Sequence, residues 1–455
     1  MMAQSSLLRV RVPVASSLRM QPLVRTLFAF LLISAAAAAL RSEVVPARPV
    51  IPAHRVKLSE FGAVADGRTP NEQAFRRAVA ALEKEGGGVL EVTAGRWLTR
   101  PFELASRIDL HLDAGAVIAF TTDPADSRVG KNRYRPFLLV KDATDVAISG
   151  QGTIDGQGQA WWPDAVRFRD EANRRHARSN TSPRPRLVVF EHCRRIAVEG
   201  VTLTRSPVFC LVPVECEDVS VVGVRIFNPA DAPNTDGIDP SASRRVLIKG
   251  CTIDTGDDCI AVKAGSRSGL RSEDILITDC TFLHGHGCSI GSETYSGVRN
   301  MTVQHCRFVG TETGIRMKSD RRRGGLVEHL VYSDITMRDV GHAISISSYY
   351  MGTTTDSSGK ALADEARPVT ATTPQWRDIV IRNLRATACR KSAGLILGLP
   401  EMPVEGIVLD HVTIEAPKGM RIAHAKNVRL QDVTFLVKEG PALSVDKTVE
   451  GLVTR

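Results

Sequence analysis

The chain has 455 residues and a formal net charge of +9. Its length allows two or three domains, although an elongated all-β fold of this size can form one body. No basic stripe interleaved with aromatic residues occurs, so nothing indicates a nucleic-acid partner. The positive surplus suits an anionic ligand but is also common in proteins without one.

Residues 1–40 are interpreted as an export signal. They contain arginines and no acid, and residues 26–40 form an uncharged stretch of the length of a secretory apolar region, with small residues for cleavage at 35–39. The alternative is an uncleaved membrane anchor. Because Met20 alone begins a compact signal, residues 1–19 are a candidate mis-assigned start. Cleavage removes four arginines and lowers the charge from +9 to +5, giving a secreted or periplasmic protein without lasting membrane association.

An amphipathic helix is predicted within residues 69–88. Thr69, Pro70 and Glu72 form a start signal, and three glycines at 86–88 end the pattern. Its apolar face consists of Phe75, Ala78, Val79 and Leu82. Since the region that follows is repetitive, we expect this helix to close the N-terminal end of a solenoid, within a cap of about residues 55–100.

An internal repeat fills the rest of the chain. Its units, each alternating apolar and polar residues, start at Val146, Ile196, Val219, Val246, Ile275, Met301, Leu330, Ile379, Ile407 and Val428. From Ile196 to Leu330 the starts follow one another at a nearly constant interval. Each unit is too short to bury its apolar face alone, so the units are predicted to stack as a parallel β-helix with strands about 4.8 Å apart.

The cysteines fit the same register. Equivalent positions of successive units are occupied by Val224, Cys251, Cys280, Cys306, Ile335, Leu384, Val412 and Val433. Cysteine therefore alternates with core residues, and packing is favoured over the alternative of disulfides in an exported protein. The odd total of nine cysteines and the lack of a CxxC pair argue against a zinc site.

Titratable side chains are predicted to converge on one face of the stack. Asp257 and His286 lie at the same offset from the starts of two successive units, so the two should be neighbours. Further candidates from adjacent turns are Asp236, Asp239, Asp258, Arg316 and Lys318. Singly, such residues are usually solvated or structural. Together, adjacent carboxylates separate their pKa values, which provides an acid and a base at one pH.

At this point the motifs "NTDG", "GDD", "GHG" and "RMK" resemble, in order, the polygalacturonase-like glycoside hydrolases of family 28, in the pectinase β-helix superfamily. "FGAVADG", "GAVIAF" and "GTIDGQGQAWW" are also similar to that family. The resemblance implies an all-β, single-stranded, right-handed parallel β-helix, forming one catalytic domain over residues 41–455. The order of the four motifs, together with the spacing of Asp236 and Asp257, makes this resemblance specific.

The resemblance implies hydrolysis with inversion. Asp257 is expected to protonate the glycosidic oxygen, while Asp236 and Asp258 hold a water on the opposite face. The expected carboxyl separation is roughly 6.5–9.5 Å. His286 is expected to tune the acid. No metal or other cofactor is implied.

The implied substrate is polygalacturonate, an acidic plant cell-wall polysaccharide, or its oligosaccharides. Arg316 and Lys318 are expected to bind a galacturonate carboxylate, and the family's tyrosine corresponds to Tyr349 or Tyr350. Met317 replaces the common isoleucine, a tolerable core exchange. Rhamnogalacturonan-cleaving relatives typically lack the Arg-x-Lys pair. Its presence here favours unbranched galacturonan as the substrate, and another pectic polymer is the alternative.

Two long segments are expected to set the mode of attack, one starting at Trp161 and the other following Tyr350. They either close the groove for exo-cleavage, which we favour, or leave it open. Trp161 and Trp162 stack on sugars or form a buried pair. The run at 321–323 attracts a polyanion or is a solvated turn. A calcium-dependent lyase and a non-catalytic carbohydrate-binding solenoid are the remaining alternatives, and the chain is expected to be monomeric.

Overall fold

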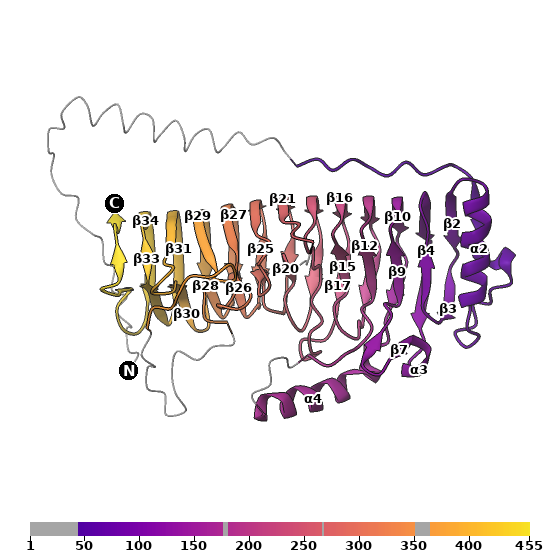
Figure 1. Cartoon of the computed structure of the whole chain (residues 1–455), viewed down its shortest axis with the longest axis horizontal. Coiled ribbons are helices and arrows are strands. Elements are labelled where there is room, and N and C mark those ends of the chain that lie inside the picture. Colours follow the sequence, from indigo (N-terminus) through magenta and orange to yellow (C-terminus); the bar gives the residue numbers. More distant parts are fainter. Residues whose placement is uncertain (1–43, 176–180, 266–267, 351–364) are drawn as a thin grey trace, which may run out of the picture.

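The computed structural model describes residues 44–175, 181–265, 268–350 and 365–455. The interpreted export signal and most of the insertion after Tyr350 lie outside these ranges. The described chain forms a parallel β-helix, as predicted (Figure 1). Among the described residues, no helix has both the length and the apolar character needed to cross a membrane.

One large parallel sheet, here called sheet A, runs the whole length of the solenoid. Its strands are β1 (Arg55–Lys57), β2 (Gly88–Val92), β3 (Gly95–Thr99), β5 (Ile108–Leu112), β6 (Ala116–Phe120), β10 (Thr144–Gly150), β11 (Thr153–Asp155), β13 (Arg194–Glu199), β14 (Thr202–Thr204), β16 (Glu217–Val222), β17 (Arg225–Phe227), β18 (Arg244–Lys249), β19 (Thr252–Asp254), β21 (Ser272–Thr278), β22 (Thr281–Phe282), β24 (Val298–Gln304), β25 (Arg307–Val309), β27 (Leu326–Arg338), β29 (Gln375–Thr387), β31 (Val404–Ala416), β33 (Ala425–Lys426), β34 (Arg429–Val437), β36 (Val449–Glu450) and β37 (Val453–Thr454).

The opposite wall, here called sheet B, has two parallel parts. They are β4 (Phe102–Leu104), β9 (Leu138–Lys141), β12 (Val188–Glu191) and β15 (Leu211–Val214), followed by β20 (Ile260–Val262), β23 (Cys288–Gly291), β26 (Thr313–Lys318), β28 (His342–Ser347), β30 (Ser392–Leu397), β32 (Lys418–Ala423) and β35 (Leu443–Val445). Single bridges from Ile238 to Leu211 and to Ile260 join the two parts. A small antiparallel pair, β7 (Arg128–Gly130) and β8 (Arg133–Tyr134), lies outside the stack.

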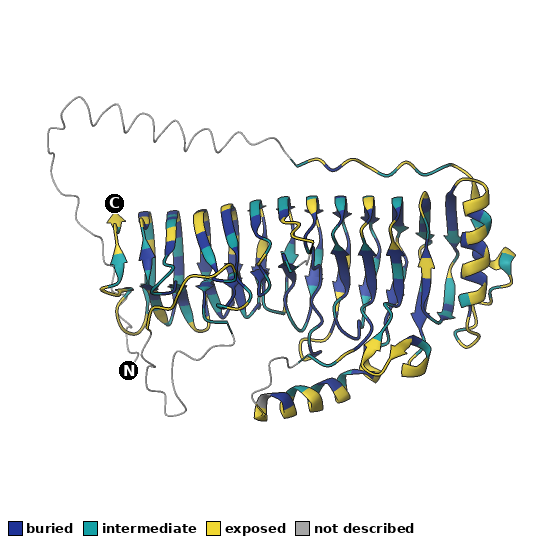
Figure 2. Ribbon diagram, in the orientation of Figure 1, coloured by how far each residue is buried: buried dark blue, intermediate teal, exposed yellow. Residues whose placement is uncertain are grey.

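The repeat register is confirmed along sheet A. The predicted unit starts pair in order, with Val146 opposite Ile196 and the ladder continuing to Ile407. Each turn supplies apolar side chains to the interior and polar ones to solvent, which produces the continuous buried core of Figure 2.

The cysteines lie in this core, as predicted. All nine are buried and free. The pairings of Thr252 with Thr281 and of Thr281 with Arg307 stack the preceding residues, Cys251, Cys280 and Cys306, on one another. Cysteine acts here as a small apolar core residue.

Corners between strands use left-handed backbone. Gly250, between β18 and β19, has φ of 63°, and the equivalent Asp279 of the next turn has φ of 57°. Glycine adopts this conformation without a Cβ penalty, and aspartate is among the few other residues that tolerate it. The chain can therefore turn sharply at the same point in successive units.

The predicted cap is confirmed as helix α2 (Glu72–Lys84), next to the short 3₁₀ helix η2 (Leu58–Phe61). Its buried face contains the predicted apolar residues, and the Phe75 ring stacks on Phe102 with 4.0 Å between centroids. Asn71 precedes the helix, but its side chain bonds the backbone of Val64, Thr69 and Leu98 instead of capping α2.

The segment starting at Trp161 contains a helix that the sequence did not predict. After the 3₁₀ helix η3 (Gly158–Ala160), α4 (Trp162–Arg174) projects from the solenoid near the short helix α3 (Pro124–Ser127) (Figure 1). Trp161 is buried, edge-on to Tyr134. Trp162 donates its indole N–H to the Ser206 carbonyl at 3.1 Å. The buried alternative is therefore correct for Trp161.

Candidate active site

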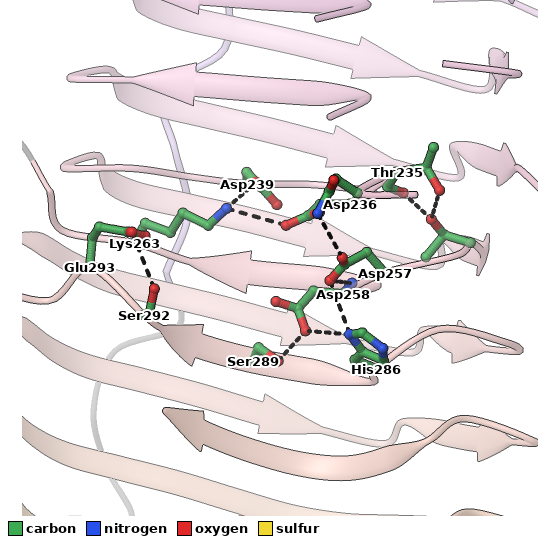
Figure 3. A network of polar contacts seen from close by, with 12 residues as sticks. Thr235, Asp236, Asp239, Asp257, Asp258, Lys263, His286, Ser289, Ser292 and Glu293 are labelled. Carbon is green, nitrogen blue, oxygen red and sulfur yellow. Dashed lines mark hydrogen bonds and ion pairs between the residues drawn. The ribbon is translucent and has the colours of Figure 1, made fainter. Parts of the chain in front are cut away.

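The predicted acidic residues come together on the outer side of sheet B, where β20 and β23 follow the bridge at Ile238 (Figure 3). His286 Nδ1 lies 3.0 Å from Asp257 Oδ1 and 3.9 Å from Asp258 Oδ1. The predicted contact of Asp257 with His286 is therefore present.

The imidazole reaches both aspartates because the two sheets differ in register. In sheet A, Val246 pairs with Ile275, and the same offset carries Asp257 onto His286. In sheet B, Ile260 pairs with Cys288, an offset shorter by a single position, which carries Asp258 onto His286 instead. The register of sheet B thus brings Asp258 close to the same ring.

Asp257 is held from two sides. Asn234 donates from Nδ2 to Asp257 Oδ2 at 3.3 Å, while His286 and the Asp258 backbone N–H contact Oδ1, the latter at 2.9 Å. Burial is the largest influence on Asp257 and opposes its ionisation, but the hydrogen bond to His286 and the charges of His286 and Lys318 together outweigh it, so the pKa of Asp257 lies below its ordinary value. The side chain stays 20% exposed, so an incoming ligand can reach it.

Asp258 is buried and surrounded by donors. Lys318 Nζ lies 2.6 Å from Oδ2, and Arg316 Nη1 lies 3.0 Å from Oδ1. Ser289 Oγ donates to Oδ1 at 2.7 Å. Burial disfavours the charge, but Lys318 and Arg316 outweigh it and hold the pKa of Asp258 well below its usual range. This carboxylate is therefore ionised over the whole physiological range.

Asp236 has the opposite electrostatics. It shares one buried cation with Asp239, because Lys263 Nζ lies 3.2 Å from Asp236 Oδ2 and 2.6 Å from Asp239 Oδ2. Burial and the neighbouring Asp239 charge raise the pKa of Asp236 well above its ordinary value. Here one ammonium serves two carboxylates, whereas Asp258 alone has two cations.

The cation pair and the tyrosines can now be located. The Tyr350 ring centroid lies 5.1 Å from Lys318 Nζ and 6.0 Å from the guanidinium carbon of Arg316. Tyr349 instead lies beside Arg321, at 5.7 Å. The structure therefore brings Tyr350, and not Tyr349, to the predicted carboxylate-binding pair.

The basic run at 321–323 is a turn whose three arginines form ion pairs with carboxylates. Arg321 forms two hydrogen bonds to Glu401, at 2.6 and 3.0 Å. Arg322 pairs with Asp320, and Arg323 pairs with Glu293. Since each guanidinium already faces a carboxylate, and Arg321 and Arg323 are partly buried, the run is an ion-paired turn and neither a free polyanion-attracting patch nor a fully solvated turn.

Four residues of the site were not predicted from the sequence. Besides Asn234, Lys263 and Ser289, Arg184 is buried and donates to the carbonyls of Pro207 and Pro233 and to Asn234 Oδ1, at 2.8, 3.0 and 2.9 Å. By accepting from Arg184, the Asn234 amide is oriented to donate to Asp257. Ser289 was detectable, because it pairs with Arg316 in the β23–β26 ladder.

Asp257, Asp258 and His286 also meet the geometric requirement for holding a cation, since one ligand atom from each lies within 4.8 Å of the others. However, Arg316 and Lys318 already neutralise Asp258. A divalent ion would bind against these two positive charges. The arrangement fits acid–base chemistry on an anionic substrate better than metal binding.

Comparisons with known proteins agree with this geometry. The model of "Glycosyl hydrolases family 28" matches residues 100–435. A probable polygalacturonase of Vitis vinifera is 32% identical over 395 residues, covering 81% of this chain and 76% of its own length. A solved exopolygalacturonase from Thermotoga maritima is 30% identical, with a TM-score of 0.70, and the match covers 86% of this chain and 95% of that one. A Yersinia enterocolitica exopolygalacturonase, 20% identical with a TM-score of 0.74 over 88% of this chain and 78% of that one, shares the fold.

Proposed function

The chain belongs to family 28 of the glycosyl hydrolases and is a glycoside hydrolase with a right-handed parallel β-helix, and we propose that it hydrolyses α-1,4-linked galacturonate in polygalacturonate with inversion. The observation that carries this proposal is the position of Asp257. It is partly exposed to solvent, it lies next to the buried Asp236 and Asp258, and the cation pair of Arg316 and Lys318 is adjacent.

In the proposed reaction, Asp257 donates its proton to the glycosidic oxygen as the bond from that oxygen to the anomeric carbon breaks. A water held by Asp236 and Asp258 attacks the anomeric carbon from the opposite face and loses a proton to Asp236. Asp236 accepts the proton in its ionised form, and its raised pKa makes that carboxylate the stronger base, while Asp258 orients the water.

The acid role requires a protonated Asp257, although its pKa is lowered without substrate. A galacturonate carboxylate bound by Arg316 and Lys318 adds a negative charge and draws both cations from Asp258. Both effects raise the pKa of Asp257 in the complex. His286, in contact with Asp257, is positioned to return a proton after each turnover.

The mode of attack is proposed to be exo. Support comes from the Thermotoga maritima relative, which is named an exopolygalacturonase and is 30% identical. We further propose that the chain is exported through residues 1–40 and acts as a monomer on pectin outside the cytoplasm.

The test is incubation of the mature chain with de-esterified polygalacturonate and a chelator, following reducing ends, ultraviolet absorbance and product size. Reducing ends without absorbance are expected, with monomer as the main product for exo-action. Proton NMR of the first product should show the inverted anomer. Chelator-sensitive absorbance would indicate a lyase instead, and no product would favour a branched pectin or a binding role.

A further inference from the structure

A further cation, Arg186, lies in the same column of sheet B, on the N-terminal side of the acidic residues. Four positions are aligned by the pairings of Val188 with Leu211, of Leu211 with Ile238 and of Ile238 with Ile260. Two residues before these partners, in successive turns, lie Arg186, Phe209, Asp236 and Asp258. Arg186 and Phe209 therefore continue the column of the proposed catalytic carboxylates toward the N-terminal end.

Side-chain contacts support this alignment. Lys263 Nζ, which binds Asp236, lies only 4.2 Å from the Phe209 ring centroid. The guanidinium carbon of Arg186 lies 5.5 Å from the same ring. The following residues, Leu187 and Cys210, are fully buried in the core, so alternation directs Arg186 and Phe209 outward. Both are partly exposed.

Arg186 differs from the other cations of the site in its partners. Arg316, Lys318 and Lys263 are each bound to a carboxylate. For Arg186 the described residues provide the Phe209 ring but no side-chain hydrogen bond or ion pair. Stacking restrains a guanidinium while its fork of N–H donors stays available to a planar anion.

We propose that Arg186, oriented by Phe209, binds the carboxylate of a second acidic sugar across the cleavage point from Arg316 and Lys318. This inference rests on the proposed function and adds to it the residue that binds a second uronate. On the N-terminal side, Arg186 lies two turns before Asp236, and two strand spacings are on the order of 10 Å. On the C-terminal side, Arg316 lies two turns after Asp258. The substrate class is then a chain with uronates on both sides of the cleaved bond.

The alternative role for Arg186 is support of Asp239. Burial raises the pKa of Asp239, and Lys263 and Arg186 oppose that rise. If this were its whole role, replacing Arg186 would weaken the binding of acidic and esterified ligands equally. Binding measurements separate the two roles.

The experiment is calorimetric titration of hexagalacturonate into the mature Asp257→Asn chain, whose turnover is expected to be slow enough for binding to be read, with and without Arg186→Gln. Arg186→Gln should weaken the binding of hexagalacturonate by about tenfold to hundredfold, as for a lost charged hydrogen bond. The affinity for the fully methyl-esterified hexamer should not change. Arg186→Lys, which keeps the charge but not the fork, should fall between. Arg225→Gln, a partner-bearing exposed arginine on sheet A, is the matched control and should have little effect.

Combining Arg186→Gln with Lys318→Ala should give additive losses, because the two cations serve separate sugars. Unchanged hexagalacturonate affinity in Arg186→Gln, or equal losses for the acidic and esterified hexamers, would overturn the inference. A folded Arg186→Gln chain is verified by an unchanged melting temperature. Binding is read without catalysis, so this result is independent of the turnover assay that tests the proposed function.

Discussion

Asp236 and Asp258 are both buried aspartates, only one turn apart, yet their pKa values shift in opposite directions. In the Asp236 cluster, two carboxylates share Lys263. In the Asp258 cluster, one carboxylate has Lys318, Arg316 and the Ser289 hydroxyl. Burial is common to both, so the local ratio of cations to carboxylates decides which side chain stays ionised and which becomes a stronger base.

Asp257 lies between the two clusters and takes one hydrogen bond from each side, from Asn234 and from His286. It is also more exposed than either neighbour. An acid that must contact a glycosidic oxygen needs this access, whereas a carboxylate that fixes a water does not. The comparison therefore supports the proposal that three carboxylates of the same residue type have different tasks.

The largest effect is expected from Asp257→Asn. Loss of a general acid typically costs about 10²–10⁴-fold in rate, and the neutral amide keeps the shape, so kcat should collapse while the melting temperature stays near that of the parent. The matched control is Asp254→Asn, which removes another aspartate–histidine contact, 2.7 Å to His284, on the exposed surface. Near-normal rates for Asp257→Asn would refute the acid assignment.

A smaller effect is expected from Lys318→Ala, which leaves Arg316 to neutralise Asp258 without the lysine. kcat/KM on polygalacturonate should fall by about tenfold to hundredfold, and much less on a methyl-esterified substrate. The depressed pKa of Asp258 contributes stability that is present above the ordinary aspartate pKa and is lost as pH falls. The variant should therefore unfold more easily at neutral pH, with less additional loss in acid.

Two measurements check the Lys318 prediction, namely kinetics on both substrates and denaturant unfolding at several pH values. Lys391→Ala removes a lysine from an exposed pair with Glu312 and serves as the control, since exposed pairs contribute about 0–1 kcal/mol. Equal losses on acidic and esterified substrates would exclude a carboxylate-binding role.

The smallest effect is a pH shift in Asp239→Asn. Removing the Asp239 charge leaves Lys263 to Asp236 alone, so the pKa of Asp236 should fall. If Asp236 is the base, the acidic limb of the kcat/KM profile moves to lower pH. An unmoved limb, with the enzyme otherwise active, would assign that limb to another group. Asp254→Asn again provides the unshifted reference.

Much of the architecture was predictable because a stacked repeat exposes its register in the sequence. Equal offsets from the unit starts correctly placed Asp257 beside His286, and the same counting placed Cys251, Cys280 and Cys306 in one core column. These predictions needed only the period of the repeat. The helix α4 was missed because the segment starting at Trp161 interrupts that period.

The sequence by itself determined the parallel β-helix, its cap and the set of carboxylates and cations that share one face, because alternation and spacing fix which residues stack. The tertiary structure alone decided how these charges are shared. It placed Lys263 between Asp236 and Asp239, gave Asp258 two cations, oriented Asn234 through Arg184 and brought Tyr350 to Lys318. These contacts depend on corner conformations and side-chain directions across turns, which residue spacing does not encode.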